Sequence, residues 1–507
     1  MQRRFTSASA IVLYIAAGKL IFHLLTASRY GIFRDELYYL ACAEHLAWGY
    51  VDQPPLIAGV AWLARHAFGD SLIGLRLLPA IAGAAVVWLA GILAREMGGG
   101  RFAQALAALA VATAPLYLIF HHWLTMNAFD PLIWMGCAWF VLRAINSGDP
   151  RYWLGFGALT GVGLENKYAI AVFVCGVVVG LLLTPNRRFL FTRWFWLGAA
   201  AALVIFLPNL IWLAAHHFPF LELLRNVRAS GRDVVRAPVA FLADQAFIMN
   251  PISFPLWAGG LVWLIASHKG RRFAVLGWTF VAVMTLFIAL HGKNYYVAPV
   301  YPMMFAAGAV GFEQMTEPRA GWLRAASVVL ILVSASALAP LVSPLLSPEA
   351  YLRYQKAIGL APPEAEHQPT GPLPQYFADE FGWEQMVREV ARVYHSLAPD
   401  ERARAAIFAN NYGEAGAIDF YGPRYGLPKA ISVHQNYWFW GPRDYTGDLV
   451  IILGSNGRGD RQHFESVEAV GRVENPYSKL DERYDIFLCR NLKVPFREGW
   501  PALKRWR

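Results

Sequence analysis

The chain has 507 residues, of which 56% are hydrophobic, 14% aromatic and only 16% charged, and its formal net charge is +10. Ordinary globular domains carry about 25% charged residues, so this composition argues strongly against a soluble protein. The basic residues separate the apolar stretches and are not gathered in one patch, which favours the charge bias of a membrane protein over nucleic-acid binding. The four cysteines show no spacing typical of a disulfide framework.

Apolar runs dominate residues 1–345. Several contain about 17 to 22 residues with few charges, close to the length that crosses a hydrocarbon core as a helix. The first run could be a signal peptide, but its length and the runs that follow favour an uncleaved helix. A short helix over residues 56–68 is expected at the membrane surface. We predict about eleven spans, at residues 8–27, 72–94, 102–120, 128–142, 153–164, 168–183, 194–214, 252–266, 273–290, 297–312 and 322–341.

The charges at the span ends predict an orientation. Arg3 and Arg4 precede the first span, and other basic residues follow the spans that lead inward, as in cytoplasmic loops. The N-terminus is then cytoplasmic, and the first outer loop, residues 29–71, is extracytoplasmic. An odd number of spans places the C-terminal region outside as well. We predict a transmembrane domain over residues 1–345 and an extracytoplasmic domain over residues 346–507.

The C-terminal region begins with a change to Pro-rich, charged sequence near residue 343, which marks a domain boundary. Beyond it, residues 404–412, 413–422, 448–454 and 484–492 read as strand, helix, strand and strand. This order predicts a small α/β domain. The GEAG sequence at the start of the helix is not a GxGxxG fingerprint, so a turn into a helix is favoured over a phosphate or sugar site.

The first outer loop holds the richest cluster of polar residues, including Arg34, Asp35, Glu36 and Asp52 among several aromatic residues. Asp35 and Glu36 are adjacent, so on a helix they point about 100° apart, and only one of them need face inward. A carboxylate in partly apolar surroundings has a raised proton affinity, which suits a general base for a hydroxyl group. The alternative is a solvated loop with an aromatic interface belt.

Other polar residues follow spans at the same predicted face. Asp130 lies at the start of a predicted helix, where its charge also complements the helix dipole. A role in capping that helix is therefore an equal alternative to a role in the site. Lys167 separates two short apolar stretches, and an ionisable group at membrane depth suggests function. Lys293, Tyr295 and Tyr296 precede a helix and could meet an anionic headgroup or simply anchor the interface.

No metal site is predicted. The pairs His121 with His122 and His216 with His217 are adjacent, so they cannot easily face one ion and are expected to be interfacial. The acidic cluster of the first outer loop could bind a divalent cation, and no other cofactor is indicated.

The motif RDELYYLACAEHLAWGYVDQPPL, residues 34–56, closely resembles the first outer loop of bacterial glycosyltransferase family 39 and its relatives. These relatives include the protein O-mannosyltransferases, the lipid A aminoarabinose transferase and lipopolysaccharide-core galacturonosyltransferases, all of the GT-C membrane fold. HHWLTMNAFDPL, GLENKYAI and KNYYVAPVYP follow in the family's order. The resemblance covers residues 1–345.

The resemblance implies Asp35 as the catalytic base, with Glu36 as a second site carboxylate, and a polyprenyl-phosphate sugar as the donor. Many relatives have Lys where this chain has Gln53, so the cation that contacts the phosphate must come from elsewhere. The residues expected to contact substrates are Arg34, Asp52, Asp130, Lys167, Lys293, Tyr295 and Tyr296.

The expected function is a glycosyltransferase of the bacterial inner membrane that moves a sugar from a polyprenyl phosphate to a hydroxyl group outside, with inversion. The acceptor could be a lipid, a polysaccharide or a protein, and nucleic acid is not an expected partner. The main alternative is a transporter or flippase of lipid-linked sugars, but such a protein should carry mid-span charges and repeated broken helices, which are not evident. A non-catalytic glycan receptor is a third possibility.

Overall fold

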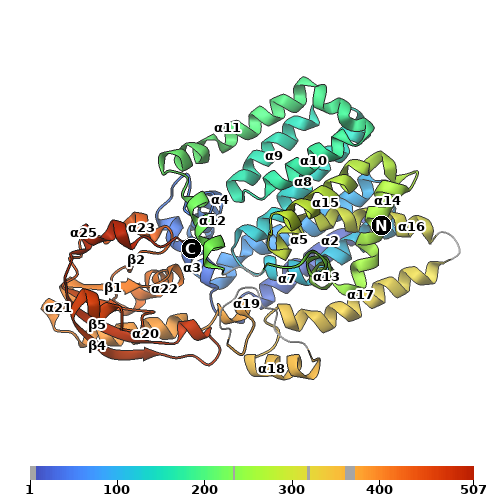
Figure 1. Ribbon diagram of the computed structural model, residues 1–507. Coiled ribbons are helices and arrows are strands. Elements are labelled where there is room, and N and C mark those ends of the chain that lie inside the picture. The colour runs from blue at the N-terminus through green and yellow to red at the C-terminus, as the bar shows by residue number, and fades with distance from the viewer. Residues whose placement is uncertain (1–6, 232–234, 317–319, 360–370, 507) are drawn as a thin grey trace.

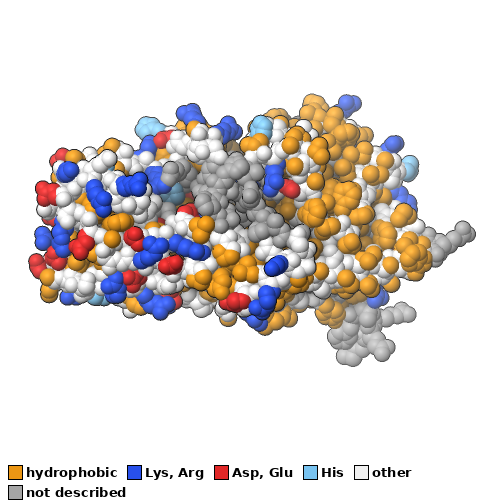
Figure 2. All heavy atoms as spheres, turned by 60° about the horizontal axis from the view of Figure 1, so that its bottom comes forward, with side chains coloured by type: hydrophobic (Ala, Val, Ile, Leu, Met, Phe, Trp, Pro, Cys, Tyr) orange, Lys and Arg blue, Asp and Glu red, His pale blue; other side chains and the backbone are white. Residues whose placement is uncertain are grey.

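The computed structural model describes residues 7–231, 235–316, 320–359 and 371–506. Arg3 and Arg4, on which the predicted orientation partly depends, lie outside the described residues. The chain forms a helical half and a smaller sheet domain, with helix α3 between them (Figure 1). Hydrophobic side chains cover much of the helical half, whereas charged side chains are spread over the sheet domain (Figure 2).

The helical half follows the predicted apolar runs, because every run predicted as a span is helical. Its main helices are α2 (Ala8–Thr26), α5 (Leu72–Glu96), α6 (Arg101–Thr113), α7 (Pro115–Phe120), α8 (Met126–Ser147), α9 (Tyr152–Asn166), α10 (Ile170–Leu182), α11 (Arg193–Ala215), α14 (Phe254–Ala266), α15 (Ala274–Ala289), α16 (Tyr301–Met315) and α17 (Gly321–Val342). Among the described residues, six helices are long and apolar enough to cross a membrane, or up to eight if each sharply bent pair counts as one span. The chain is therefore a multi-pass membrane protein, while the predicted number of spans stays a prediction.

The third predicted span is broken where Pro115 starts α7. Ala114 before it is extended, as the residue before a proline usually is. The Lys19 Nζ reaches this break from α2 and donates to the carbonyl oxygens of Tyr117 at 3.0 Å and Ala112 at 3.3 Å. Lys19 is thus a lysine buried inside a span, which the sequence analysis did not expect, and it donates to one carbonyl oxygen on each side of the break.

Four further helices lie in the loops that connect the long ones. They are α3 (Arg34–Glu44), α4 (Leu56–Phe68), α12 (Pro219–Ser230) and α13 (Pro238–Ile248). The helix predicted over residues 56–68 is confirmed as α4. The C-terminal end of the chain contacts α12, because the Asn226 side chain donates to the Trp506 carbonyl oxygen at 2.8 Å.

The sheet domain contains a mixed five-stranded sheet in the order β2-β1-β3-β5-β4. β1 pairs in parallel with β2 and β3, and β5 pairs antiparallel with β3 and β4. The strands are β1 (Ala405–Ala409), β2 (Ile431–Ser432), β3 (Leu449–Ile452), β4 (Phe464–Val473) and β5 (Tyr484–Leu492). The longer helices of this domain are α18 (Pro348–Ala357), α20 (Trp383–Ser396) and α22 (Tyr412–Tyr421).

The three strands and the helix predicted for this region are observed as β1, β3, β5 and α22. The sequence analysis missed β2 and β4 for two different reasons. β2 has only two residues, and β4 is an edge strand whose side chains are mostly solvent-accessible, so it lacks an apolar run.

The first outer loop and the sheet domain share one hydrophobic core, in which α3 crosses α22. A Cβ added at Gly416 would lie 2.9 Å from the backbone of Leu37, and one at Gly413 would lie 2.7 Å from Arg34 Cγ. Asn411 caps the first turn of α22 and Glu414 accepts from its backbone N–H, so the helix start is already satisfied. The glycines of GEAG therefore allow two helices to approach closely.

We predict that Gly416→Ala destabilises the folded protein by about 1 to 3 kcal/mol, because the added methyl group meets backbone atoms that cannot move aside. The temperature of thermal unfolding in detergent should fall. Gly59→Ala in α4 is the matched control, since a Cβ there has no atom within 4 Å. Equal effects from the two variants would contradict the close contact between α3 and α22.

Candidate active site

Asp35 lies in the first turn of α3 and faces a cavity outside the helix. The Tyr412 hydroxyl donates to its Oδ1 at 2.8 Å, although Tyr412 belongs to the sheet domain. The Tyr412 ring stacks on His434, with ring centroids 5.1 Å apart and an interplanar angle of 3°. The carboxylate is therefore held by a residue 377 positions away in the chain.

Two cavities meet at Asp35. The larger one, called here the central cavity, has a volume of about 520 Å³, and the smaller side cavity has about 300 Å³. Asp35, Lys293 and Tyr412 line both. A ligand in either cavity can thus reach the same carboxylate and the same ammonium group.

Asp52 lies in the central cavity and accepts a hydrogen bond from the Tyr38 hydroxyl at 2.9 Å. Burial raises the pKa of Asp52 to about 7, although the hydrogen bond from Tyr38 acts in the opposite direction. The negative charge of Asp35 adds to the increase in pKa. Asp52 can therefore carry a proton near neutral pH.

Lys167 brings a second cation to the central cavity. Its Nζ donates to Asn127 Oδ1 at 2.6 Å, lies 3.7 Å from Asp130 Oδ2 and sits 4.5 Å from the centroid of the Tyr296 ring. Asp130 is buried behind Lys167 and accepts from the Asn166 side chain at 2.7 Å. Asp130 lines neither cavity, so it contacts the ammonium group and not the ligand space.

Glu36 points away from both cavities, into the protein, and is fully buried. It forms a two-pronged ion pair with Arg76 of α5, with N–O distances of 3.0 and 2.7 Å. It also accepts from the backbone N–H groups of Phe33 and Leu124, each at 2.8 Å. Glu36 does not reach either cavity, so the expectation that it is a second catalytic carboxylate is not supported.

Arg76 connects three parts of the chain. Besides Glu36, its guanidinium donates to the carbonyl oxygens of Ala27 at 2.7 Å and Gly31 at 2.8 Å, and to Glu380 Oε2 at 3.2 Å. Glu380 belongs to the C-terminal region, so this buried group ties that region to α5. Burial raises the pKa of Glu380 to about 8, against the opposing effect of Arg76.

The structure brings most of the predicted site residues together. Asp35, Asp52, Lys167, Lys293 and Tyr296 line the central cavity, and Arg34, Asp35, Lys293 and Tyr295 line the side cavity. Glu36 and Asp130 lie behind the cavity walls. Gln53 is buried against Cys42 and lines neither cavity.

The sequence analysis missed Arg76, Glu380, Tyr38 and Tyr412. A usable signal existed for Arg76, because it is a single charge inside a long apolar helix. Tyr38 lies within the motif of the first outer loop but was not predicted as a site residue, and no local signal marked Glu380 or Tyr412. Among the described residues, no group of three or more His, Cys, Asp or Glu side chains is placed to hold a metal ion.

Whole-chain similarity to solved structures defines the fold. The chain is similar to ArnT from Cupriavidus metallidurans in a structure with bound undecaprenyl phosphate, with a TM-score of 0.61 and 15% sequence identity over 95% of this chain and 98% of that one. It is also similar to the mycobacterial arabinofuranosyltransferase AftD, with a TM-score of 0.54 and 13% identity over 97% of this chain and 40% of that one. The chain has the GT-C fold, which confirms the predicted fold class.

Sequence similarity points to the same group of proteins. The model of the dolichyl-phosphate-mannose-protein mannosyltransferase family matches residues 52–212. The lipid A galacturonosyltransferase RgtD of Rhizobium johnstonii is 28% identical over 265 residues, which are 50% of this chain and 54% of that protein. The chain thus spans about half the length of this curated relative. The resemblance predicted from the motifs is confirmed.

We predict that Arg76→Met destabilises the protein by about 3 to 5 kcal/mol, because it leaves Glu36 buried without its partner charge. The fraction of the Arg76→Met protein that remains monodisperse in detergent after heating should be much smaller than that of the wild type. The control is Arg65→Met, which breaks partly exposed pairs with Glu44 and Asp70 in the first outer loop and should cost about 1 kcal/mol or less. A similar loss from both variants would contradict the role of the buried pair.

Glu380 makes a pH-dependent contribution to stability. Because its pKa rises from 4.5 to about 8 on folding, the folded state holds this proton more tightly than the unfolded state. Its stabilising contribution is complete below pH 4.5 and is lost as the pH rises to 8. Glu380→Gln keeps a neutral side chain at every pH, so its melting temperature should fall less than that of the wild type across this interval.

The control for this pH dependence is Glu384→Gln, which changes an exposed side chain of α20. It should follow the wild-type dependence of melting temperature on pH. If Glu380→Gln also followed the wild type, Glu380 would not be the group responsible.

Proposed function

We propose that this protein is a membrane glycosyltransferase that moves a sugar from a polyprenyl phosphate to a hydroxyl group of an acceptor. The observation that carries this proposal is the position of Asp35 and Lys293 in the wall shared by two cavities. A carboxylate between two ligand spaces can serve as base for one substrate while a cation neutralises the other. The GT-C fold and the sequence similarity to glycosyltransferases support the same activity.

The side cavity is the proposed donor site. It shares Leu116, Ile119 and Tyr376 with a third cavity of about 390 Å³, lined mostly by apolar residues of α7, α13 and α17. A prenyl chain can occupy this apolar space while its phosphate meets Arg34 and Lys293. The similarity to ArnT, whose structure holds undecaprenyl phosphate, supports this choice of donor.

The central cavity is the proposed acceptor site. Asp52 and Lys167 provide polar contacts on one side, whereas Val172 of α10 and Leu223 and Val227 of α12 provide an apolar wall on the other. An acceptor with a sugar headgroup and a hydrocarbon part fits this combination. The similarity to a lipid A galacturonosyltransferase supports an acceptor of this kind.

The proposed reaction is a direct displacement. Asp35 takes the proton of the acceptor hydroxyl as its oxygen attacks the anomeric carbon, and the bond from that carbon to the phosphate oxygen breaks with its electrons on the phosphate. Arg34 and Lys293 neutralise the leaving phosphate, so no strong general acid is needed. Attack from the face opposite the phosphate inverts the anomeric centre.

Three residues are proposed to position the reacting groups without touching the substrates. Glu36 and Arg76 hold the first turn of α3, so that Asp35 faces the junction of the cavities. Asp130 holds Lys167 through its charge. We place this site at the extracytoplasmic face of a bacterial inner membrane, with the N-terminus in the cytoplasm and the sheet domain outside.

The decisive test is turnover by purified protein with a panel of polyprenyl-phosphate sugars and a lipid acceptor, detected as released polyprenyl phosphate. Asp35→Asn should lower the rate by at least about 100-fold, as expected for loss of a general base. Its melting temperature should change little, because the amide can still accept from Tyr412.

Asp70→Asn is the control, since Asp70 is an exposed acid of the same outer loop that pairs with Arg65. It should retain the wild-type rate. Normal turnover by Asp35→Asn would remove Asp35 as the base, and no turnover of any donor by the wild type would contradict the proposed activity.

A further inference from the structure

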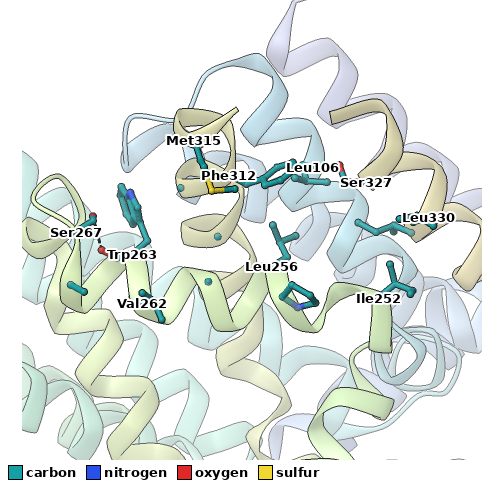
Figure 3. A pocket seen from close by; sticks show the side chains of 16 residues that line it. Leu106, Ile252, Leu256, Val262, Trp263, Ser267, Phe312, Met315, Ser327 and Leu330 are labelled. Carbon is teal, nitrogen blue, oxygen red and sulfur yellow. Dashed lines mark hydrogen bonds between the residues drawn. The ribbon is translucent and has the colours of Figure 1, made fainter. Parts of the chain in front are cut away.

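A lateral groove runs along the outside of the helical half, away from the proposed active site. It lies between α14, α16 and α17 and has a volume of about 680 Å³, within the range of about 300 to 1,000 Å³ typical of ligand pockets. Figure 3 shows Leu256, Val262, Trp263, Phe312 and Leu330 along its walls. The groove shares no lining residue with the central or side cavity, so it is not part of the proposed donor or acceptor site.

The groove exists because two helices pack closely while a third stands apart. A Cβ added at Gly308 of α16 would lie 1.8 Å from the Leu256 carbonyl oxygen, so α14 and α16 nearly touch through their backbones. In contrast, other parts of the protein cover little of α17, since only 6% of its most apolar 18-residue stretch is buried. Gly259 lines the space between them, and a Cβ added there has no atom within 4 Å.

One end of this apolar groove lies next to basic residues in the chain. Ser267 lines that end, and Lys269, Arg271 and Arg272, which are all exposed, follow it within five residues. An apolar channel with basic side chains at one end matches a phospholipid with an anionic headgroup. Lys and Arg residues near a membrane surface attract anionic lipid.

We propose that the lateral groove binds one anionic phospholipid, with an acyl chain along α14 and the phosphate at Lys269 and Arg271. The acyl chain replaces the side-chain contacts that α17 does not make with α14. The bound lipid is distinct from both substrates of the proposed transferase, and this inference stands without that function.

The test uses native mass spectrometry of the full chain in detergent, titrated with phosphatidylglycerol or with phosphatidylcholine of the same acyl chains. The wild type should retain one phosphatidylglycerol under activation that strips phosphatidylcholine. Gly259→Leu fills the groove and should lose this lipid. Gly18→Leu in α2 is the matched control, because a Cβ there also has no atom within 4 Å, and it should retain the lipid.

The double variant Lys269→Ala, Arg271→Ala tests the headgroup contact. Its preference for phosphatidylglycerol over phosphatidylcholine should fall by roughly tenfold or more, given the contribution of each cation. Unchanged lipid retention by Gly259→Leu, or equal losses from Gly259→Leu and Gly18→Leu, would overturn the proposal. A protein dimer that only Gly259→Leu dissociates would also overturn it, by showing a second copy in the groove.

Discussion

The buried ion pair between Arg76 and Glu36 is the interaction on which the rest of the structure depends. A guanidinium inside an apolar helix cannot face lipid without a large desolvation penalty, so it must be paired within the protein. Its partner, Glu36, lies in the first turn of α3, so the ion pair fixes α3 against α5. The Arg76 guanidinium also contacts Glu380, so the same side chain ties the C-terminal region to the membrane helices.

This arrangement makes the candidate site composite. α3 provides Asp35, the ends of membrane helices provide Lys167 and Lys293, and the sheet domain provides Tyr412. The glycines of α22 allow its backbone to approach α3, which brings Tyr412 within hydrogen-bond distance of Asp35. The sheet domain is therefore part of the site wall and shares its core with the first outer loop.

The four acidic residues predicted at the site fall into two physical groups. Asp35 and Asp52 face a cavity and receive hydroxyl hydrogen bonds from tyrosines, so they can exchange protons with a ligand. Glu36 and Asp130 are buried beside a cation that they hold in place. Asp35 and Glu36 belong to different groups although they are adjacent, because successive residues of a helix point about 100° apart.

The sequence by itself determined the membrane class, the apolar helices, three of the five strands and seven of the residues that line the two cavities. Apolar runs and charges at span ends are local properties, and the motif of the first outer loop is a continuous stretch of sequence. It also predicted that only one carboxylate of the Asp35 and Glu36 pair need face inward, but not which one. Only the tertiary structure decided that Glu36 is the buried one, that Arg76 pairs with it and that Tyr412 holds Asp35. Such contacts join residues far apart in the chain, so they depend on how whole helices pack, and the local sequence does not identify the partners.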